Sequence, residues 1–142
     1  MFPKIGQFEI SVEGDLVLVR SSPVFNLEAA QEYAAAMETI IDRMPPTFGV
    51  MTRFESPPIV GPDVEASLKE TAQRRAERGM VAVAFVIPTA DQGGLSIARA
   101  QWDRIYTPIG VALSIFSGVD SARLWLREQI EIAHEKRGGN SN

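Results

Sequence analysis

The sequence contains no cysteine and only one histidine, His134, among its 142 residues. Without cysteine there can be no disulfide, no thiolate nucleophile and no zinc site built on thiolates. A single histidine near the end of the chain is a poor general base, and it rules out most histidine triads and histidine metal clusters. We therefore expect no metal site and no catalysis based on cysteine or histidine.

The sequence also lacks an excess of positive charge and any long apolar run. It has 14 Lys and Arg against 18 Asp and Glu, a net charge of −4. Proteins that bind nucleic acids or anionic membranes depend on basic surfaces, so we expect neither partner. The longest uncharged apolar stretches, 79–87 and 109–116, are far shorter than a membrane span, and residues 1–8 have no secretory apolar run. We expect a cytoplasmic protein.

What is present is an ordinary globular composition. Hydrophobic residues make up 45% of the chain and charged residues 23%, which excludes wholesale disorder. This length fits one domain with a sizeable core, and we find no internal repeat or linker. We predict a single domain over residues 1–142, with its core at about 7–133 and a polar tail at 137–142.

Hydrophobic periodicity divides the chain into strands and helices. Apolar and polar residues alternate over 8–13, and continuous apolar runs follow at 16–19 and 81–87, which is typical of strands. Elsewhere apolar residues recur every three or four positions, which predicts amphipathic helices. The predicted strands are 8–13, 16–19, 48–54, 81–87 and 111–116, and the predicted helices are 27–44, 63–78, 95–106 and 119–136.

Turn and cap residues define the order of these elements. Gly14-Asp15 joins the first two strands as a hairpin, Pro45-Pro46 ends the first helix and Gly79 caps the second. Strand–helix–strand repetition implies parallel pairing through right-handed crossovers, and the hairpin adds one antiparallel strand. We predict a single-domain α/β fold with a mixed five-stranded sheet in the order ββαβαβαβα.

Three stretches carry a family resemblance: the hairpin at 8–16, the strand at 82–86 and the segment 116–126. The last fits the pattern F-x-x-x-x-x-A-x-x-W-L, which is common at the end of SpoIIAA-like chains. With the element order, these stretches resemble the STAS / SpoIIAA-like family of anti-sigma factor antagonists and stand-alone bacterial domains, over about residues 7–133. The resemblance implies a STAS/SpoIIAA-like fold and a regulatory role that depends on binding.

The resemblance does not extend to a phosphorylation switch. Anti-sigma factor antagonists carry a phosphorylatable serine in an Asp-Ser-Ser-Gly type segment where the third strand meets the second helix. Here the segment 52–63 reads TRFESPPIVGPD, and Ser56 lies several residues before the helix. The resemblance therefore does not carry the phosphorylation switch over to this chain, and it leaves open whether any serine is phosphorylated.

Polar side chains follow several of the predicted strands. Ligands of such sheets bind outside the carboxyl ends of the parallel strands, so we expect the loops after these strands to converge there. Arginines beside hydroxyl groups could hold a phosphate or a carboxylate through charge-assisted hydrogen bonds. The alternative, more common for strand-end arginines, is that they pair with Glu55 or Asp91 and stay solvated. The candidate residues are Arg20, Ser22, Arg53, Ser56 and Asp91.

The loop after the strand at 48–54 is unusually apolar, with two prolines followed by Ile59 and Val60. It could contact a protein partner or a second copy of the chain, or form a lid over an apolar pocket. Alternatively, it tucks back over the edge of the sheet. We take Phe54, Ile59 and Val60 as its candidate contact residues.

Other conspicuous residues have ordinary structural explanations. Trp102 and Trp125 lie on apolar helical stripes, so we expect both in the core. Arg74, Arg75 and Arg78 share a helix with acidic residues at spacings that allow ion pairs within the helix. We therefore interpret these three arginines as a solvated face.

Two functions of different classes remain open. The first is a non-enzymatic regulatory or interaction module that binds a protein partner or homodimerises. The alternative is a domain that binds a small apolar or lipid-like ligand at the carboxyl ends of the parallel strands, in a pocket lined by Met51, Phe54 and the third helix. An enzyme fits least, because no nucleophile–base pair or carboxylate pair has a diagnostic spacing. Gly93-Gly94 lacks the rest of a phosphate-binding motif, so we assign no cofactor.

Overall fold

The secondary structure follows the predicted alternation of strands and helices. The computed structural model describes residues 4–5, 8–21, 27–55, 57–88 and 92–140. The strands are β1 (Lys4–Ile5), β2 (Phe8–Glu13), β3 (Leu16–Ser21), β4 (Phe48–Arg53), β5 (Met80–Val86) and β6 (Ala112–Phe116). The helices are α1 (Leu27–Ile41), α2 (Pro62–Arg78), α3 (Gln92–Tyr106) and α4 (Val119–Asn140), with a short 3-10 helix, η1 (Thr107–Ile109), after α3.

The strands form one mixed sheet in sequence order, β1-β2-β3-β4-β5-β6. β2 and β3 are the two strands of an antiparallel hairpin, and β3, β4, β5 and β6 pair in parallel. This confirms the predicted α/β fold, with its mixed sheet and all five predicted strands. The two-residue β1 extends the sheet beyond β2, and a strand this short leaves no periodic signal in the sequence.

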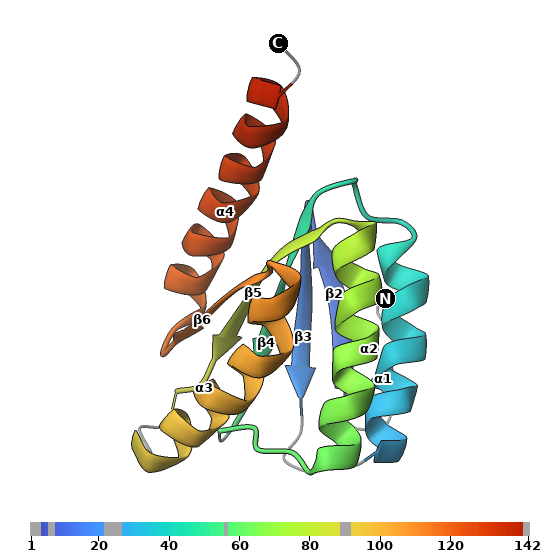
Figure 1. Cartoon of the computed structure of the whole chain (residues 1–142), viewed down its shortest axis with the longest axis vertical. Helices are drawn as coiled ribbons and strands as arrows, with labels where there is room; N and C mark the ends of the chain where they lie inside the picture. Colours follow the sequence, from blue (N-terminus) through green and yellow to red (C-terminus); the bar gives the residue numbers. More distant parts are fainter. Residues whose placement is uncertain (1–3, 6–7, 22–26, 56, 89–91, 141–142) are drawn as a thin grey trace.

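Three helices cover one face of the sheet and the fourth covers part of the other. Crossovers between parallel strands are right-handed in nearly all proteins, so helices that connect strands advancing in one direction share a face. α1, α2 and α3 pack with strand residues that include Val50 and Val83. α4 packs with their immediate neighbours Met51 and Ala84, which point to the opposite face. Figure 1 shows α1, α2 and α3 in front of the sheet.

Small residues allow α4 to approach the sheet closely. Ala82 and Ala84 face it from β5, and a Cβ atom on Gly49 of β4 would lie 3.1 Å from Cδ2 of Leu126. α4 packs mainly on β4, β5 and β6. The same face of β3 is less well covered, and Leu18 in the middle of that strand is only half-buried.

Two helix ends differ from those predicted. The last helix is predicted to end near residue 136, but α4 continues to Asn140 and projects past the sheet in Figure 1. α1 ends at Ile41 rather than at residue 44, because the N–H groups of Arg43 and Met44 bond to carbonyls three residues back. No described helix is both long and apolar enough to cross a membrane.

Candidate functional site

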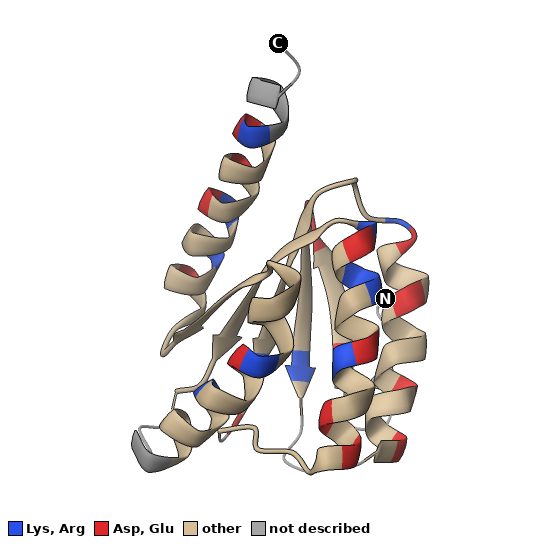
Figure 2. Ribbon diagram, in the orientation of Figure 1, with Lys and Arg blue, Asp and Glu red and all other residues tan. Residues whose placement is uncertain are grey.

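Two arginines lie side by side at the carboxyl ends of β3 and β4. The parallel register pairs Arg20 with Arg53 and, two residues earlier, Leu18 with Met51. Because side chains alternate along a strand, all four project from the face on which α4 packs. Both arginines are exposed, and Figure 2 shows the basic carboxyl end of β3. The strand register itself therefore places the two arginines next to each other on one face of the sheet.

Neither arginine has an acidic partner among the described residues. The ion pairs within this part of the chain involve other basic side chains. Glu9 is the Cα partner of Arg20 in the β2–β3 hairpin, but no ion pair joins them. Adjacent strands lie about 4.8 Å apart, so the two positive charges repel each other. The predicted pairing with Glu55 is not observed, and Asp91 lies outside the described residues.

The two arginines line a groove of about 470 Å³ between α4 and the exposed part of the sheet. Leu18 and Met51 give it an apolar floor, and Val119 in the first turn of α4 borders it. Glu9 and Ser11 line its β2 side. The groove exists because α4 packs mainly on β4, β5 and β6 and leaves this part of the face open.

A third arginine, Arg123 of α4, forms the wall of the groove. Its Nε donates to Oε2 of Glu13 at 2.7 Å and its Nη2 to Oε1 of the same side chain at 3.3 Å. Arg127 donates to Glu13 at 3.1 Å, and Asp120 accepts from Arg123 at 3.3 Å. These contacts connect α4 to the end of β2, across the groove. Because the guanidinium of Arg123 is bonded to Glu13 and Asp120, we assign it a structural role and not a ligand-binding one.

A second hollow, of about 440 Å³, adjoins the groove at the carboxyl end of the sheet. It shares Arg20, Arg53 and Val119 with the groove and adds Ser117 and Gly118, which precede α4. The first turn of a helix carries unpaired N–H groups and a partial positive charge. An anion between the two arginines would therefore also lie near the positive end of α4.

The remaining candidate residues differ in their exposure, and some lie outside the described residues. Phe54 is half-buried and packs edge-to-face on Phe85 with their ring centroids 5.0 Å apart. Val60 is also buried, so of the three predicted contact residues only Ile59 is exposed. Three candidates lie outside the described residues: Ser22, Ser56 and Asp91.

The predicted lining of an apolar pocket is wrong. Met51 and Phe54 lie on opposite faces of the sheet, because they are three positions apart along an extended chain. On the α3 side, Phe85 packs edge-to-face on Trp102, with ring centroids 4.9 Å apart, and Trp102 stacks on Tyr106 at 6.1 Å. Aromatic rings therefore fill the space between Phe54 and α3, and the groove that Met51 lines lies on the α4 side of the sheet.

The loop from Pro57 to Gly61 is tied to α3 by side-chain hydrogen bonds. The buried amide of Gln101 accepts from the N–H of Val60 at 2.9 Å and donates to its carbonyl at 2.6 Å. The indole N–H of Trp102 donates to the carbonyl of Pro58 at 2.7 Å. The backbone of the loop is thus bonded to α3. No sequence pattern singles out Gln101, because its partner is 41 residues away.

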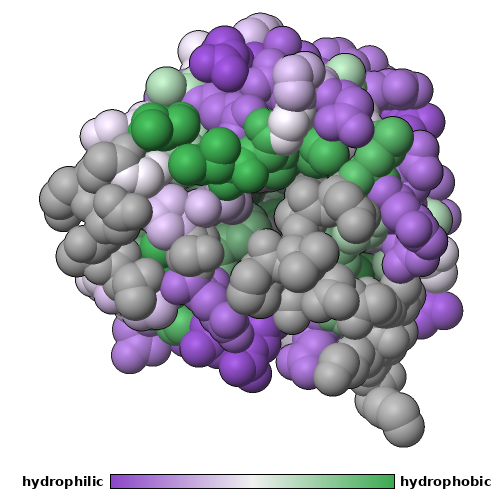
Figure 3. Space-filling view, turned by 90° about the horizontal axis from the view of Figure 1, so that it is seen from below, coloured by the Kyte–Doolittle hydropathy of each residue, from purple (hydrophilic) through white to green (hydrophobic). Residues whose placement is uncertain are grey.

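Two isoleucines remain exposed at this end of the molecule. Ile59 of the loop is 52% exposed and Ile97 of α3 is 58% exposed. Ile97 lies one helical turn before Gln101, on the same side of α3 as the clamped loop. Figure 3 shows a band of apolar residues across this end. We call Ile59 and Ile97 the apolar end surface; sequence reasoning found the first and missed the second.

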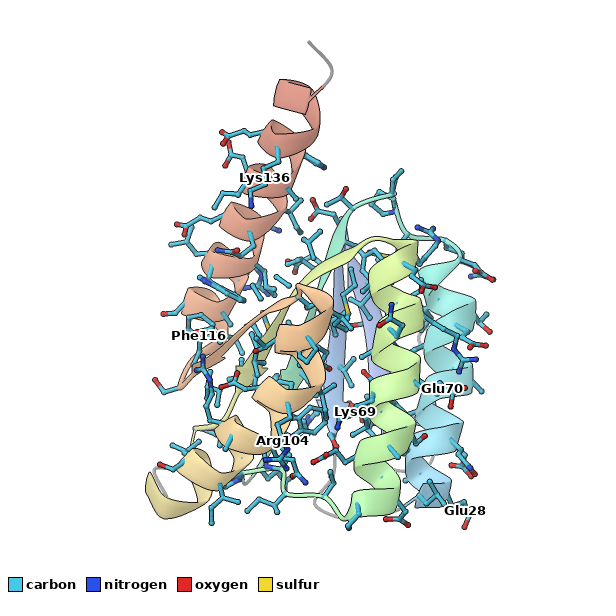
Figure 4. The ribbon with its side chains drawn as sticks, viewed as in Figure 1. Glu28, Lys69, Glu70, Arg104, Phe116 and Lys136 are labelled. Atoms are coloured by element: carbon cyan, nitrogen blue, oxygen red, sulfur yellow. The ribbon has the colours of Figure 1, made fainter. Side chains whose placement is uncertain are left out.

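An ion-pair cluster joins α2 to α3. Nη2 of Arg104 donates to Oε1 of Glu65 at 2.8 Å, and Nζ of Lys69 lies 3.4 Å from Oε2. Figure 4 shows Lys69 and Arg104 on these neighbouring helices. The hydrogen bond from Arg104 holds the pKa of Glu65 below its ordinary value of 4.5. This cluster holds α3, and with it the clamped loop, against α2.

The arrangement of polar groups gives no metal centre among the described residues, since no three acidic or histidine side chains lie together there. Comparisons with protein-family models, with curated proteins and with solved structures find no match for this chain. The functional argument therefore rests on the geometry of the groove and of the apolar end surface.

Proposed function

We propose that this chain is a non-enzymatic binding module whose groove takes a small amphipathic anion. The observation that carries the proposal is the pair Arg20 and Arg53, which lie in register at the end of the groove without an acidic partner among the described residues. The anionic head of the ligand lies between the two guanidinium groups. Its apolar body lies on Leu18 and Met51.

The head group follows from the chemistry of arginine. A guanidinium donates paired hydrogen bonds to the oxygen atoms of a carboxylate or a phosphate, and two of them can share one such group. Bringing an anion between two like charges also removes their mutual repulsion. A neutral ligand would leave that repulsion in place, so a negative charge is the first requirement.

The apolar part follows from the floor of the groove. Leu18 and Met51 are large apolar side chains at matched register positions, and Val119 adds a third. Small-molecule sites typically have volumes of about 300–1,000 Å³, apolar linings and a few polar groups that fix orientation. The groove, at about 470 Å³, has this size and composition. A hydrocarbon chain would cover the half-buried Leu18 and Val119, whereas Met51 beneath them is already buried.

We also propose that the domain is a cytoplasmic member of the STAS / SpoIIAA-like family with a regulatory role. The order of strands and helices and the sequence pattern of residues 116–126 support this assignment. In such a module the bound ligand controls the binding of a protein partner. The groove lies beside α4, so a ligand in it changes the surface that α4 and β2 present to that partner.

Calorimetric titration with decanoate, decanol and acetate, below micelle-forming concentrations, separates the two requirements. We expect decanoate to bind at least about tenfold more tightly than either acetate, which lacks the chain, or decanol, which lacks the charge. Equal affinity for decanoate and decanol would contradict the role of the arginines.

A matched pair of variants locates the apolar part. Leu18→Thr shortens the floor of the groove and is expected to weaken decanoate several-fold without changing acetate, because only the chain contacts Leu18. Val12→Thr is the control, since Val12 is exposed on β2 and does not line the groove. An equal effect of both variants would place the chain elsewhere.

A second function is favoured by the apolar end surface. The clamp of Gln101 holds the loop backbone while the side chain of Ile59 stays in solvent, and rigid exposed apolar groups suit a protein interface. We propose a second copy of the chain as the partner.

Light scattering over a concentration series tests this proposal, and wild type should form a dimer. Ile59→Asp should abolish the dimer, whereas Ile132→Asp, on the exposed side of α4, should leave it intact. A wild-type monomer at every concentration would remove this candidate.

A further inference from the structure

The three neighbouring arginines of α2 have three different environments. Arg74 is exposed and lies 3.7 Å from Glu38 of α1. Arg78 donates to the carbonyls of Ile41 and Met44 at 2.9 and 2.7 Å, at the end of α1. Arg75 is only 6% exposed, so the predicted solvated face is wrong for this residue.

Arg75 lies among aromatic rings. Its Cζ atom lies 4.9 Å from the ring centroid of Tyr33 on α1, and Tyr33 stacks on Phe8 with ring centroids 4.6 Å apart. Attraction between a cation and the face of a ring compensates part of the loss of hydration. It uses none of the five N–H groups of the guanidinium, which still require acceptors.

Those acceptors are missing among the described residues. No ion pair of Arg75 occurs there, and its Nη2 is a buried nitrogen without a hydrogen-bond partner. An unpaired charge inside a protein is costly, and proteins rarely bury arginine without an anion. The buried Nη2 therefore indicates an acceptor that the described residues do not supply.

A cleft between α1 and α2 gives an acceptor access to Arg75. The cleft has a volume of about 240 Å³. Its lining residues are Ala34, Glu38, Ile41, Asp42, Thr71, Arg74, Arg75 and Arg78. Figure 2 shows residues of both signs along these two adjacent helices. Three arginines and two carboxylates line the cleft, which leaves one positive charge in excess. Arg74 pairs with Glu38 and Arg78 donates to backbone carbonyls, so among the described residues Arg75 is the one of the three without a partner.

We propose that the cleft between α1 and α2 binds a small oxyanion, which accepts hydrogen bonds from the guanidinium of Arg75. The size of the cleft limits the ligand to a group such as a carboxylate or a phosphate. Glu38 and Asp42 at the rim repel ligands of high negative charge, which favours an ion with one or two charges. This site is separate from the groove beside α4 and does not depend on the function proposed for it.

Thermal unfolding in matched salts tests this site. Wild-type protein is compared in sodium acetate, sodium phosphate and sodium chloride at equal ionic strength. A ligand that binds only the folded state raises the unfolding midpoint, on the order of 10 °C at about a hundred times its dissociation constant. We expect this rise with acetate or phosphate relative to chloride.

Arg75→Met shifts the unfolding midpoint in opposite directions in two cases. In one, Arg75 binds an oxyanion from solution; in the other, it pairs with a carboxylate of the chain itself. Methionine keeps the apolar stem and the helix propensity but removes the charge. If the cleft is an oxyanion site, this variant unfolds at a higher temperature than wild type in chloride, and it loses the rise that is specific to the oxyanion. Arg43→Met, at an exposed arginine outside the cleft, keeps that rise. The shift measured for Arg43→Met also corrects for the general effect of each salt on stability.

Two results would overturn the proposal. One is a wild-type midpoint that is the same in all three salts, with Arg75→Met unfolding at a lower temperature in chloride. The other is a rise that Arg75→Met retains in full. Glu38→Gln and Asp42→Asn show whether an oxyanion or a carboxylate of the chain neutralises Arg75. If an oxyanion does, each variant binds it more tightly, because a repelling carboxylate at the rim is gone. A carboxylate that pairs with Arg75 in solution instead lowers the midpoint when it is neutralised.

Discussion

Arg20 on β3 and Arg53 on β4 are Cα partners in a parallel register, and both line the groove beside α4. The chain as a whole has a net charge of −4, yet this end of the groove concentrates positive charge. Recognition depends on the local field, so a negative net charge does not exclude an anionic ligand.

The clamp formed by Gln101 makes a strong prediction about stability. Gln101→Ala leaves the N–H and the carbonyl of buried Val60 without partners, so we expect the free energy of unfolding to fall by about 2–4 kcal/mol. Urea denaturation measures the change. Gln73→Ala is the control, because the exposed Gln73 only donates to Glu77 at 3.1 Å, and its effect should stay within about 0.5 kcal/mol. Similar small effects for both variants would mean that packing alone holds the loop.

Gly79 is predicted to be irreplaceable at the turn between α2 and β5. Its φ angle is 132°, and a Cβ atom there would lie 1.9 Å from the carbonyl oxygen of Pro46. A backbone atom cannot move aside cheaply, so Gly79→Ala should lower the free energy of unfolding by about 2 kcal/mol or more. Gly118→Ala has open space around its Cβ and should change it by about 0.5 kcal/mol or less. A harmless Gly79→Ala would show that this turn rearranges readily.

The ion pair of Glu65 predicts a dependence on pH. Because the hydrogen bond from Arg104 lowers the pKa of Glu65 in the folded state, its contribution to stability is present above the ordinary value and is lost as the pH falls through the lowered one. Glu65→Gln should therefore lower the unfolding midpoint at pH 7, and the difference from wild type should shrink below about pH 4.5. Glu70→Gln, at an exposed position of the same helix, should show no such convergence. A constant difference down to pH 3 would contradict this assignment.

Much of the fold could be predicted because its signals are local. Alternation over 8–13, the apolar run at 81–87 and Gly79 each act within a few residues, and the structure has the corresponding hairpin, central strand and cap. The end of α4 could not be predicted, because the polar residues after 136 have no packing signal in either direction. The helix nevertheless continues to Asn140.

The candidate site was predicted less completely, since it depends on contacts between distant segments. The proximity of Arg20 and Arg53 follows from parallel strands and needs only the topology. The groove depends on where α4 lies, which Gly49 and the alanines of β5 decide by their small size. The burial of Arg75 depends on the packing of α2 against Tyr33 of α1. Its position seven residues after Leu68 places it on the buried side of α2, unlike Arg74, so the helical period carries a signal that the sequence analysis did not use.

The affinity of decanoate for wild type, Arg20→Gln, Arg53→Gln and the control Arg43→Gln tests the central claim most directly. A charge-assisted hydrogen bond contributes about 1.5–3 kcal/mol, so each groove variant should bind decanoate at least about tenfold more weakly. Arg43 is exposed after the end of α1, outside the groove, and its variant should bind as wild type does. Unchanged affinity in both groove variants, or equal losses in all three, would contradict the account.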